Sequence, residues 1–340
     1  MPITQPFLTR AAQVSFANAQ DIDNFFTQQK NGQDFISWFN TNLSKKKFWA
    51  DIKNNLGKVI HAAVVMSHDS MAHDRFNRLW SEEGIQTIFG KNTVSLLQFL
   101  SLQSIFNNET GGSLIPLTEG VGKPPLHPGI AYAFDSIKGT KISYNTMSGN
   151  KTCLALFKDA NYNNAFQNLP LGSQLKNTTN NIWAGEAYPI KTVSTSTNPA
   201  MTGYVLEADF FKFRGRGFIQ TTGRSNYSSI IDFIMKYTGD DPVINNMRSA
   251  WVLRSANTDT LATVSTNAEW DNLFQNTGGL IAAKSIEVHN RLSGDYLGKI
   301  NGTNPTTAAT SIRSMGKRIS GGDAYADLFL NRVTQMAELL

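Results

Sequence analysis

A single cysteine, Cys153, occurs in the 340 residues, so no disulfide can form within the chain. Packing must therefore stabilise the folded state. No apolar run approaches the roughly 20 residues that a membrane-spanning helix needs, and we expect no stable membrane insertion. Residues 1–20 lack a charged segment followed by a long apolar stretch, so we also expect no cleaved signal peptide and synthesis in a cytoplasm.

The charge balance is mildly basic, with 31 Lys and Arg against 26 Asp and Glu and a formal net charge of +5. This balance favours an acidic partner such as nucleic acid, an anionic membrane surface or an anionic cell-wall polymer, although it also serves solubility alone. Dense Lys/Arg tracts with interleaved aromatic residues are absent, and the one basic triplet is residues 45–47. We therefore expect no nucleic-acid binding.

The sequence divides into an N-terminal helical extension, residues 1–55, and a main domain, residues 56–340. Aromatic residues recur at helical spacing in the extension, which predicts a helical pair packed on the main domain, with a docking element as the alternative. Residues 120–205 are rich in Gly, Pro, Asn, Thr and Ser and predict a loop-rich insertion with a strand pair at 134–144. Helical periodicity predicts a mainly α fold with helices at residues 56–80, 93–108, 228–256, 278–292 and 323–340.

Histidines in the predicted helix 56–80 raise the question of a metal site. His68 and His73 are five residues apart and lie on different helical faces, whereas zinc ligands on one helix are usually four apart. Asp69 and His73 share a face, but two ligands do not make a site. We expect no metal and no cofactor.

The predicted helix 93–108 is the clearest one, because apolar side chains cover most of its circumference and indicate a buried central position. Thr93 or Ser95 can cap its first turn. Gly111 and Gly112 end it, since glycine tolerates the left-handed conformation found just beyond a helix.

Glu109 lies between this helix and the two glycines, in the block SIFNNETGG at residues 104–112. The partial negative charge at a helix C-terminus and the apolar neighbours Ile105 and Phe106 favour a protonated carboxyl group. Cleavage of a glycosidic bond requires such a group to protonate the leaving oxygen. The alternative is an ordinary solvent-exposed glutamate.

Glycosidic cleavage also needs an ionised carboxylate across the scissile bond. Glu119 follows Glu109 by ten residues, enough chain to cross a cleft and face back. Three other carboxylates flank the loop-rich region and are alternatives for this role: Glu186, Glu207 and Asp209.

A second block, FKFRGRGFIQTTGRSNY at residues 211–227, carries arginine and amide side chains on a glycine-rich turn. Arg216 lies between two glycines and can hold a carboxylate through two hydrogen bonds. Gln220, Thr222 and Asn226 offer the donors and acceptors that sugar hydroxyls and an attacking water require. No Gly-Lys-Ser/Thr follows, so a phosphate-binding loop is not expected.

Together the two blocks resemble glycoside hydrolase family 19, the chitinase-like enzymes. NETGG is similar to the family's His-Glu-Thr/Ser-Gly-Gly, with Asn108 in place of His. RGRGFIQTTGRSNY resembles Arg-Gly-Arg-Gly-x-Ile-Gln-Leu-Thr-Gly-Arg-x-Asn-Tyr of the bacterial and phage branch, with Thr221 where Leu is usual. KRISGG at 317–322 resembles Arg-x-Ile-Asn-Gly-Gly, with Ser320 in place of Asn.

The resemblance implies a mainly α, lysozyme-like, two-lobed helical fold with a catalytic cleft and a small β-element. It implies that Glu109 is the general acid, that Glu119 is the general base and that Thr222 helps to hold the attacking water. The residues that match substrate-binding positions are Arg216, Gln220, Asn226, Tyr227 and Ser320. The family inverts the anomeric centre, which implies a carboxyl separation of ~6.5–9.5 Å.

The expected substrate is peptidoglycan, because the motifs are spelled as in the phage branch and a positive charge suits an anionic wall. A phage endolysin released by a holin, or a virion-associated lysozyme, would need no signal peptide. Chitin is the alternative substrate, since both polymers contain β-1,4-linked N-acetylated sugars. A non-catalytic glycan-binding or structural phage protein is the alternative from another class.

Overall fold

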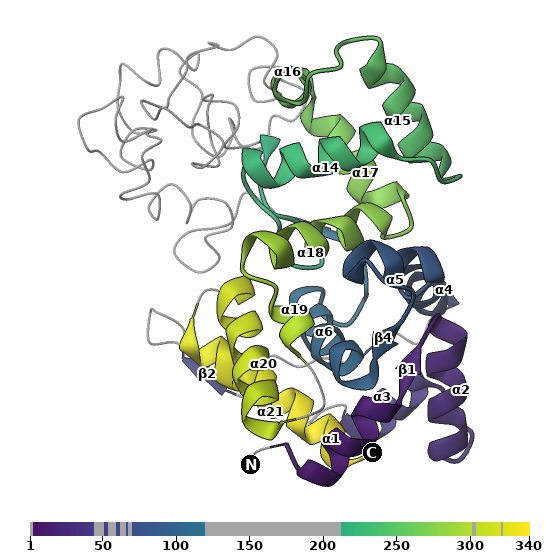
Figure 1. Ribbon diagram of the computed structural model, residues 1–340, viewed down its shortest axis with the longest axis vertical. Helices are drawn as coiled ribbons and strands as arrows, with labels where there is room; N and C mark the ends of the chain where they lie inside the picture. Colours follow the sequence, from purple (N-terminus) through teal and green to yellow (C-terminus); the bar gives the residue numbers. More distant parts are fainter. Residues whose placement is uncertain are drawn as a thin grey trace, which may run out of the picture. The chain divides into compact units, whose positions relative to one another are not determined.

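The computed structural model is mainly helical, with three two-stranded antiparallel sheets in the part it describes (Figure 1). The described residues are 3–43, 51–53, 59–61, 66, 70–119, 212–300, 304–320 and 322–340. The predicted insertion 120–205, including the strand pair 134–144, lies outside these ranges. The chain forms two compact units, which we call unit 1 (Met1–Pro116 and Gly278–Leu340) and unit 2 (Leu117–Thr277).

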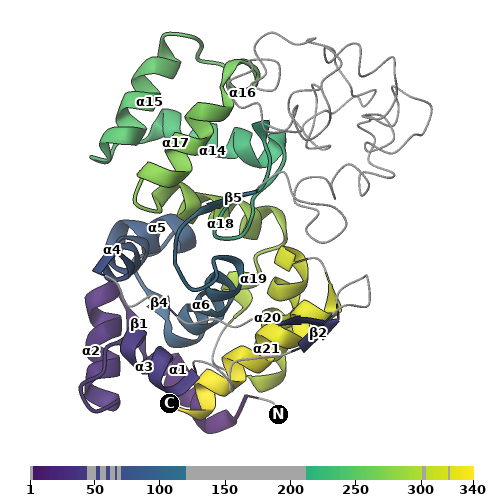
Figure 2. The same cartoon turned by 180° about the vertical axis from the view of Figure 1, so that it is seen from behind.

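Unit 1 combines helices from both ends of the chain. Its helices are α1 (Gln5–Gln13), α2 (Ala19–Gln29), α3 (Phe35–Leu43), α4 (Ser70–Leu79), α5 (Glu82–Phe89), α6 (Leu96–Glu109), α18 (Leu280–Leu292), α19 (Tyr296–Lys299), α20 (Pro305–Ser320) and α21 (Asp323–Glu338). Helices α20 and α21 pack side by side in both views, and α6 packs against α1 and α21 (Figures 1 and 2). Two short strands, β1 (Ser15–Phe16) and β4 (Val94–Ser95), pair beside the start of α6.

Helix α6 is the centre of unit 1, as its sequence predicts. Its residues from Leu96 to Asn107 are all buried. Ser95 caps the first turn in a capping box with Gln98, which confirms one of the two predicted caps. Gly111 and Gly112 follow with φ of 63° and 79°, the left-handed values that end the helix.

Aromatic side chains of the N-terminal segment join this core. The Phe99 ring of α6 lies 4.8 Å from Phe35 and 6.0 Å from Phe16, measured between ring centroids. Its other ring neighbours are Phe26, Phe76 and Trp80. The described helices of residues 1–55 therefore pack on the rest of unit 1 and share its core, although there are three of them, α1, α2 and α3, where a helical pair was predicted.

The prediction of one helix over residues 56–80 is wrong in its first half. Val59–His61 forms strand β3, paired antiparallel with β2 (Asp51–Lys53), and the helix of this segment, α4, begins only at Ser70. The β-branched residues Val59 and Ile60 suit a strand, and pairing with a partner overrides a helical apolar pattern. Among the described residues, no group of three or more His, Cys, Asp or Glu side chains could hold a metal ion.

Unit 2 consists of four described helices and a small sheet. The helices are α14 (Arg224–Lys236), α15 (Pro242–Val252), α16 (Thr258–Val264) and α17 (Asn267–Asn276), and the sheet pairs β5 (Leu117–Thr118) with β6 (Arg216–Gly217). The predicted helix 228–256 is broken between α14 and α15. Asp241 caps α15, and Pro242 stands at its first position, where a missing N–H costs nothing.

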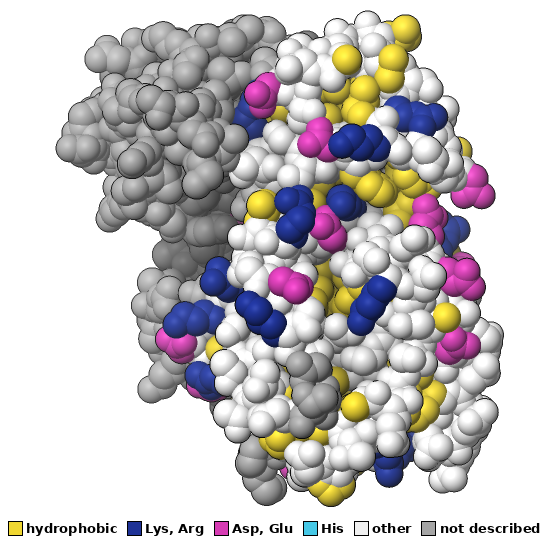
Figure 3. Space-filling view, viewed as in Figure 1, with side chains coloured by type: hydrophobic (Ala, Val, Ile, Leu, Met, Phe, Trp, Pro, Cys, Tyr) yellow, Lys and Arg dark blue, Asp and Glu magenta, His cyan; other side chains and the backbone are white. Residues whose placement is uncertain are grey.

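Charged side chains are mixed in sign on the surface that Figure 3 shows. Lys and Arg lie among Asp and Glu, and no broad field of one sign covers the described part of this face. None of the described helices is long and apolar enough to cross a membrane.

Removing the Phe99 ring is expected to destabilise unit 1 strongly. Phe99 is completely buried, and Phe99→Ala should cost ~3–5 kcal/mol of unfolding free energy through lost contacts and a cavity. Urea denaturation measures the loss. Leu292→Ala is the control, because Leu292 is 55% exposed, and an equal loss in both variants would contradict the central position of Phe99.

Candidate functional site

In unit 1, a chain of hydrogen bonds runs from α21 to the carboxyl group of Glu109. Glu109 is the last residue of α6 and is half-buried. Asn108 Nδ2 donates to Glu109 Oε1 at 3.1 Å, and Arg332 Nη1 donates to Asn108 Oδ1 at 2.9 Å. Asn108, which stands where the resembled family has His, thus links the carboxyl group to a guanidinium that is only 1% exposed.

The charge of Glu109 affects the pKa of two side chains of α21, Arg332 and Tyr325. Burial lowers the pKa of Arg332 to about 10, and the charge of Glu109 acts in the opposite direction. Burial also raises the pKa of Tyr325, and the charge of Glu109 adds to that rise. Ser320, the last residue of α20, has no described side chain.

In unit 2, Glu119 is bound to the second sequence block through its backbone and its side chain. Strand β5 pairs with β6 so that Leu117 faces Gly217 and Thr118 faces Arg216. Glu119 N then donates to Gly215 O at 2.7 Å, and Gly215 N donates to Glu119 Oε2 at 3.1 Å. Two segments 96 residues apart are joined here by hydrogen bonds in both directions.

Gly215 lies close to two polar side chains. A Cβ at this position would lie 2.7 Å from Gln220 Oε1 and 3.0 Å from Glu119 Oε2, so a larger residue would require these flexible side-chain ends to shift. The side chains of Gln220 and Glu119 therefore both approach the bare Cα of Gly215. Gln220 adopts φ of 53°, a left-handed conformation that non-glycine residues rarely hold and that is typical of functional loops.

The surroundings of Glu119 alter its ionisation. Burial raises the pKa of its carboxyl group, while the N–H of Gly215 and the charge of Arg214 act against this rise. A carboxylate whose pKa is raised binds a proton more strongly and is a better general base, provided that it stays ionised at the working pH.

Arg216 does hold a carboxylate, but that carboxylate belongs to Asp271. Arg216 Nε donates to Asp271 Oδ1 at 2.8 Å, and Nη2 donates to Asn267 Oδ1 at 2.7 Å. Its Nη1 donates to Lys212 O at 2.7 Å and to the hydroxyl of Tyr227 at 3.0 Å. All these partners lie in unit 2.

Arg216 and Tyr227 are both completely buried, so neither side chain is placed to touch a polymer at the surface. Tyr227 also donates its hydroxyl hydrogen to Arg214 O at 2.7 Å. The structure thus gives these two predicted sugar-binding residues a supporting position beneath the glycine-rich turn.

Thr222 and Asn226 lie together at the start of α14. Both are half-buried, and Asn226 Nδ2 donates to Thr222 O at 2.7 Å. Of the predicted residues in unit 2, the structure therefore brings Glu119 to Gln220 through Gly215, and Thr222 to Asn226. Glu109 belongs to unit 1, and the alternative bases Glu186, Glu207 and Asp209 lie outside the described residues.

The motifs did not reveal Asn267, Asp271 or Arg332. A signal for the first two exists, because Thr266 and Glu269 form a capping box that marks the start of α17. That start places Asn267 and Asp271 four residues apart on one helical face. Arg332 has no local signal, since its partner Asn108 lies 224 residues away.

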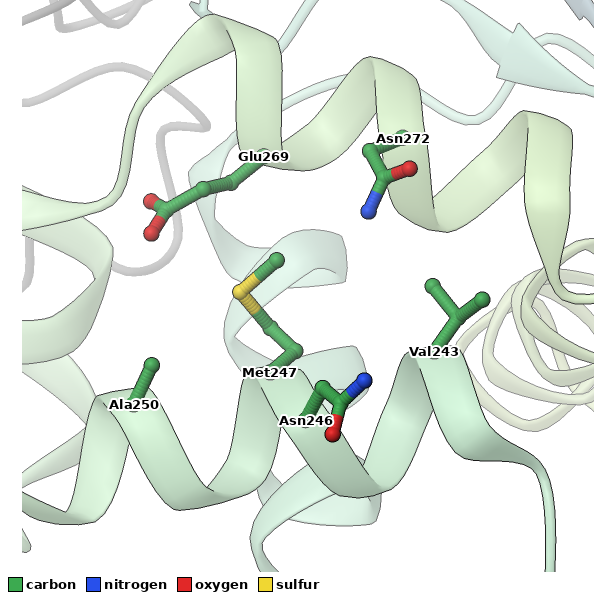
Figure 4. Close-up of a pocket in the computed structure, with 6 residues that line it drawn as sticks. All are labelled: Val243, Asn246, Met247, Ala250, Glu269 and Asn272. Atoms are coloured by element: carbon green, nitrogen blue, oxygen red, sulfur yellow. The ribbon is translucent and has the colours of Figure 1, made fainter.

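A surface pocket of about 390 Å³ lies between α15 and α17 (Figure 4). Its lining combines apolar and amide side chains with one carboxylate: Val243, Asn246, Met247, Ala250, Glu269 and Asn272. It contains none of the predicted site residues.

Comparison with known proteins adds no relative: no family model, no curated protein and no solved structure matches the chain. The resemblance to glycoside hydrolase family 19 stays a prediction from the two sequence blocks.

Thr221 offers a test of the turn's packing. Its side chain is 2% exposed, and Oγ1 is buried without a hydrogen-bond partner in the described structure. Thr221→Val keeps the shape and removes the unsatisfied hydroxyl, so it should raise the unfolding free energy by about 1 kcal/mol. Denaturation curves measure the change, with half-buried Thr222→Val as the control. A destabilised Thr221→Val protein would contradict the placement of this hydroxyl.

Glu119 should make stability depend on pH. Its folded pKa lies above the usual 4.5, so the stability it contributes is greatest below the unfolded pKa and is lost as pH rises through the folded pKa. Glu119→Gln removes that loss, and the variant should gain stability relative to wild type as the pH rises from the unfolded pKa of 4.5 through the raised folded pKa. Urea denaturation at several pH values measures the difference. If that difference stays constant with pH, folding does not alter the ionisation of Glu119.

Proposed function

We propose that this protein is a peptidoglycan hydrolase that cleaves β-1,4 glycosidic bonds between N-acetylated sugars by acid/base catalysis with inversion. Glu109 is the general acid and Glu119 is the general base. The observation that carries the proposal is the double hydrogen bond between Glu119 and Gly215, since it puts the predicted base on the predicted sugar-binding block.

The acid must present a proton to the leaving oxygen in a fixed direction. Asn108 supports this role, because its amide binds Glu109 Oε1 and is itself held by Arg332. In this proposal the amide of Asn108 and the guanidinium of Arg332 hold Glu109 in place, where the resembled family has a His.

The base must be ionised and lie beside the attacking water. Burial raises the pKa of Glu119, and the Gly215 N–H and the charge of Arg214, which favour the carboxylate form, act against that rise. Gln220 lies against the same glycine and offers an amide to water or a sugar hydroxyl. Thr222 helps to hold the water, as the resemblance implies.

The proposal extends to the lysozyme-like, two-lobed fold, and the mainly helical content of the described chain supports it. Both carboxyl groups must reach one saccharide linkage, and inversion requires them to be ~6.5–9.5 Å apart around it. The enzyme acts without a cofactor. It reaches the wall by holin release or from a virion.

Glu109→Gln tests the acid. The variant should lose at least about a hundredfold in the rate of wall lysis, because general acid catalysis contributes on that scale, while its thermal stability changes little. Turbidity loss of purified walls measures the rate. Glu338→Gln, at an exposed end of α21, is the matched control and should lyse walls normally. Full lysis by Glu109→Gln would refute the assignment.

Product analysis separates the proposal from its alternatives. Mass spectrometry of digested muropeptides should reveal a new reducing end, and proton NMR during hydrolysis should show the inverted anomer first. Cleavage of chitin oligomers but not of wall fragments would favour a chitinase. Binding to either polymer without any product would favour a non-catalytic glycan-binding protein.

A further inference from the structure

Asp271 of α17 binds two arginines with one carboxylate. Arg214 Nη2 lies 3.2 Å from each of its oxygens, and Arg216 Nε lies 2.8 Å from Oδ1. Asn267, one turn earlier, donates Nδ2 to Asp271 Oδ2 at 3.0 Å and accepts from both arginines. The two arginine side chains are 6% and 0% exposed, against 26% for Asp271.

These two arginines flank Gly215, the residue that binds Glu119. Residues 214, 215 and 216 are consecutive, so the outer two are anchored on Asp271 while the middle one is anchored on Glu119. Arg214 and Arg216, which bind Asp271, are the chain neighbours of Gly215, which binds Glu119. A substitution at Asp271 can therefore act on Glu119 through one peptide unit on each side of Gly215.

The charges around the turn are unequal. Lys212, Arg214 and Arg216 bring three positive charges, and Glu119 and Asp271 bring two negative ones. Lys212 Nζ is turned to Ala262 O at 2.9 Å. The hydroxyl of Tyr227 lies on the Arg216 side of the turn, and the amide of Gln220 lies on the Glu119 side.

Arg214 connects the two carboxylates electrostatically. Burial and the charge of Arg216 lower the pKa of Arg214 to about 10, whereas Asp271 acts to raise it. Asp271 therefore keeps Arg214 protonated and also offsets part of the positive field that Arg214 exerts on Glu119.

We infer that Asp271 is a positioning residue that acts on Glu119 through Arg214: it pairs with that guanidinium beside Gly215 and limits the positive charge that reaches the Glu119 carboxylate. The role of Glu119 as general base rests on the proposed function, whereas the effect of Asp271 on the Glu119 carboxylate does not. With less positive charge nearby, the Glu119 carboxylate takes up a proton more readily.

A purely structural role for Asp271 predicts a different response to substitution. If Asp271→Asn only loosened the turn, Glu119 would lose the Gly215 N–H and Arg214, and its pKa would rise or stay unchanged. If Asp271 offsets the charge of Arg214, the neutral Asn leaves that charge uncompensated, and the Glu119 carboxylate is favoured. The direction of the change therefore separates the two roles.

The experiment is a carbon-13 NMR titration of glutamate side-chain carboxyl groups in the full chain, with the Glu119 signal assigned by its absence in Glu119→Gln. In Asp271→Asn, the Glu119 midpoint should fall by about half a pH unit or more. Asn267→Ala is the matched control, because it disturbs the same cluster without changing its charge. In this variant the Glu119 midpoint should change less than in Asp271→Asn. An unchanged or raised midpoint in folded Asp271→Asn overturns the inference, as does an equal fall in Asn267→Ala.

A second variant covers the case in which Asp271→Asn does not fold. Arg214→Gln removes the charge that Asp271 offsets, so the Glu119 midpoint should rise, and an unchanged midpoint would overturn the inference. The titration needs no substrate. A protein that hydrolyses nothing but shows these shifts would refute the proposed function alone, whereas an active protein without them would refute only the role of Asp271.

Discussion

The two hydrogen bonds between Glu119 and Gly215 are the constraint on which the candidate site of unit 2 depends. They suit a glycine at 215, because a Cβ there would force the side-chain ends of Glu119 and Gln220 to shift. They also require the turn to stay in place, which the buried guanidinium of Arg216 ensures through bonds to four neighbours. A buried arginine is tolerated only where its donors are satisfied, and Asp271 and Asn267 accept two of these four hydrogen bonds.

Unit 1 supports its own carboxyl group with a different device. There Glu109 lies at the end of α6. The side-chain amide of Asn108 binds both Glu109 and Arg332 and so connects them. Both units thus set a carboxyl group near buried arginine, Arg332 in unit 1 and Arg214 and Arg216 in unit 2. In unit 2 the arginine beside the carboxylate is neutralised by another acid, whereas in unit 1 the guanidinium reaches the carboxyl group through a neutral side chain.

Local patterns were enough to predict helix α6, to narrow its cap to Thr93 or Ser95 and to place Glu109 at its end, because caps and apolar periodicity act over a few residues. The strand at Val59–His61 was missed, since strand formation depends on a partner that the local pattern does not show. The roles of Arg216 and Tyr227 were misjudged for a related reason: a motif gives residue types and spacing, while their complete burial follows from tertiary packing. Asp271 and Arg332 act over 55 and 224 residues of chain, beyond the reach of any spacing argument.

The division of unit 1 between two distant chain segments has a consequence for its synthesis. Helix α6 leaves the ribosome before unit 2, whereas α21, which packs against it, follows unit 2. The whole of unit 2 is therefore made before unit 1 can close, and the apolar surface of α6 stays without its C-terminal cover throughout that interval. The Arg332 contact to Asn108 also forms only after α21 is made, so a nascent chain carries Glu109 without this support while unit 2 is synthesised.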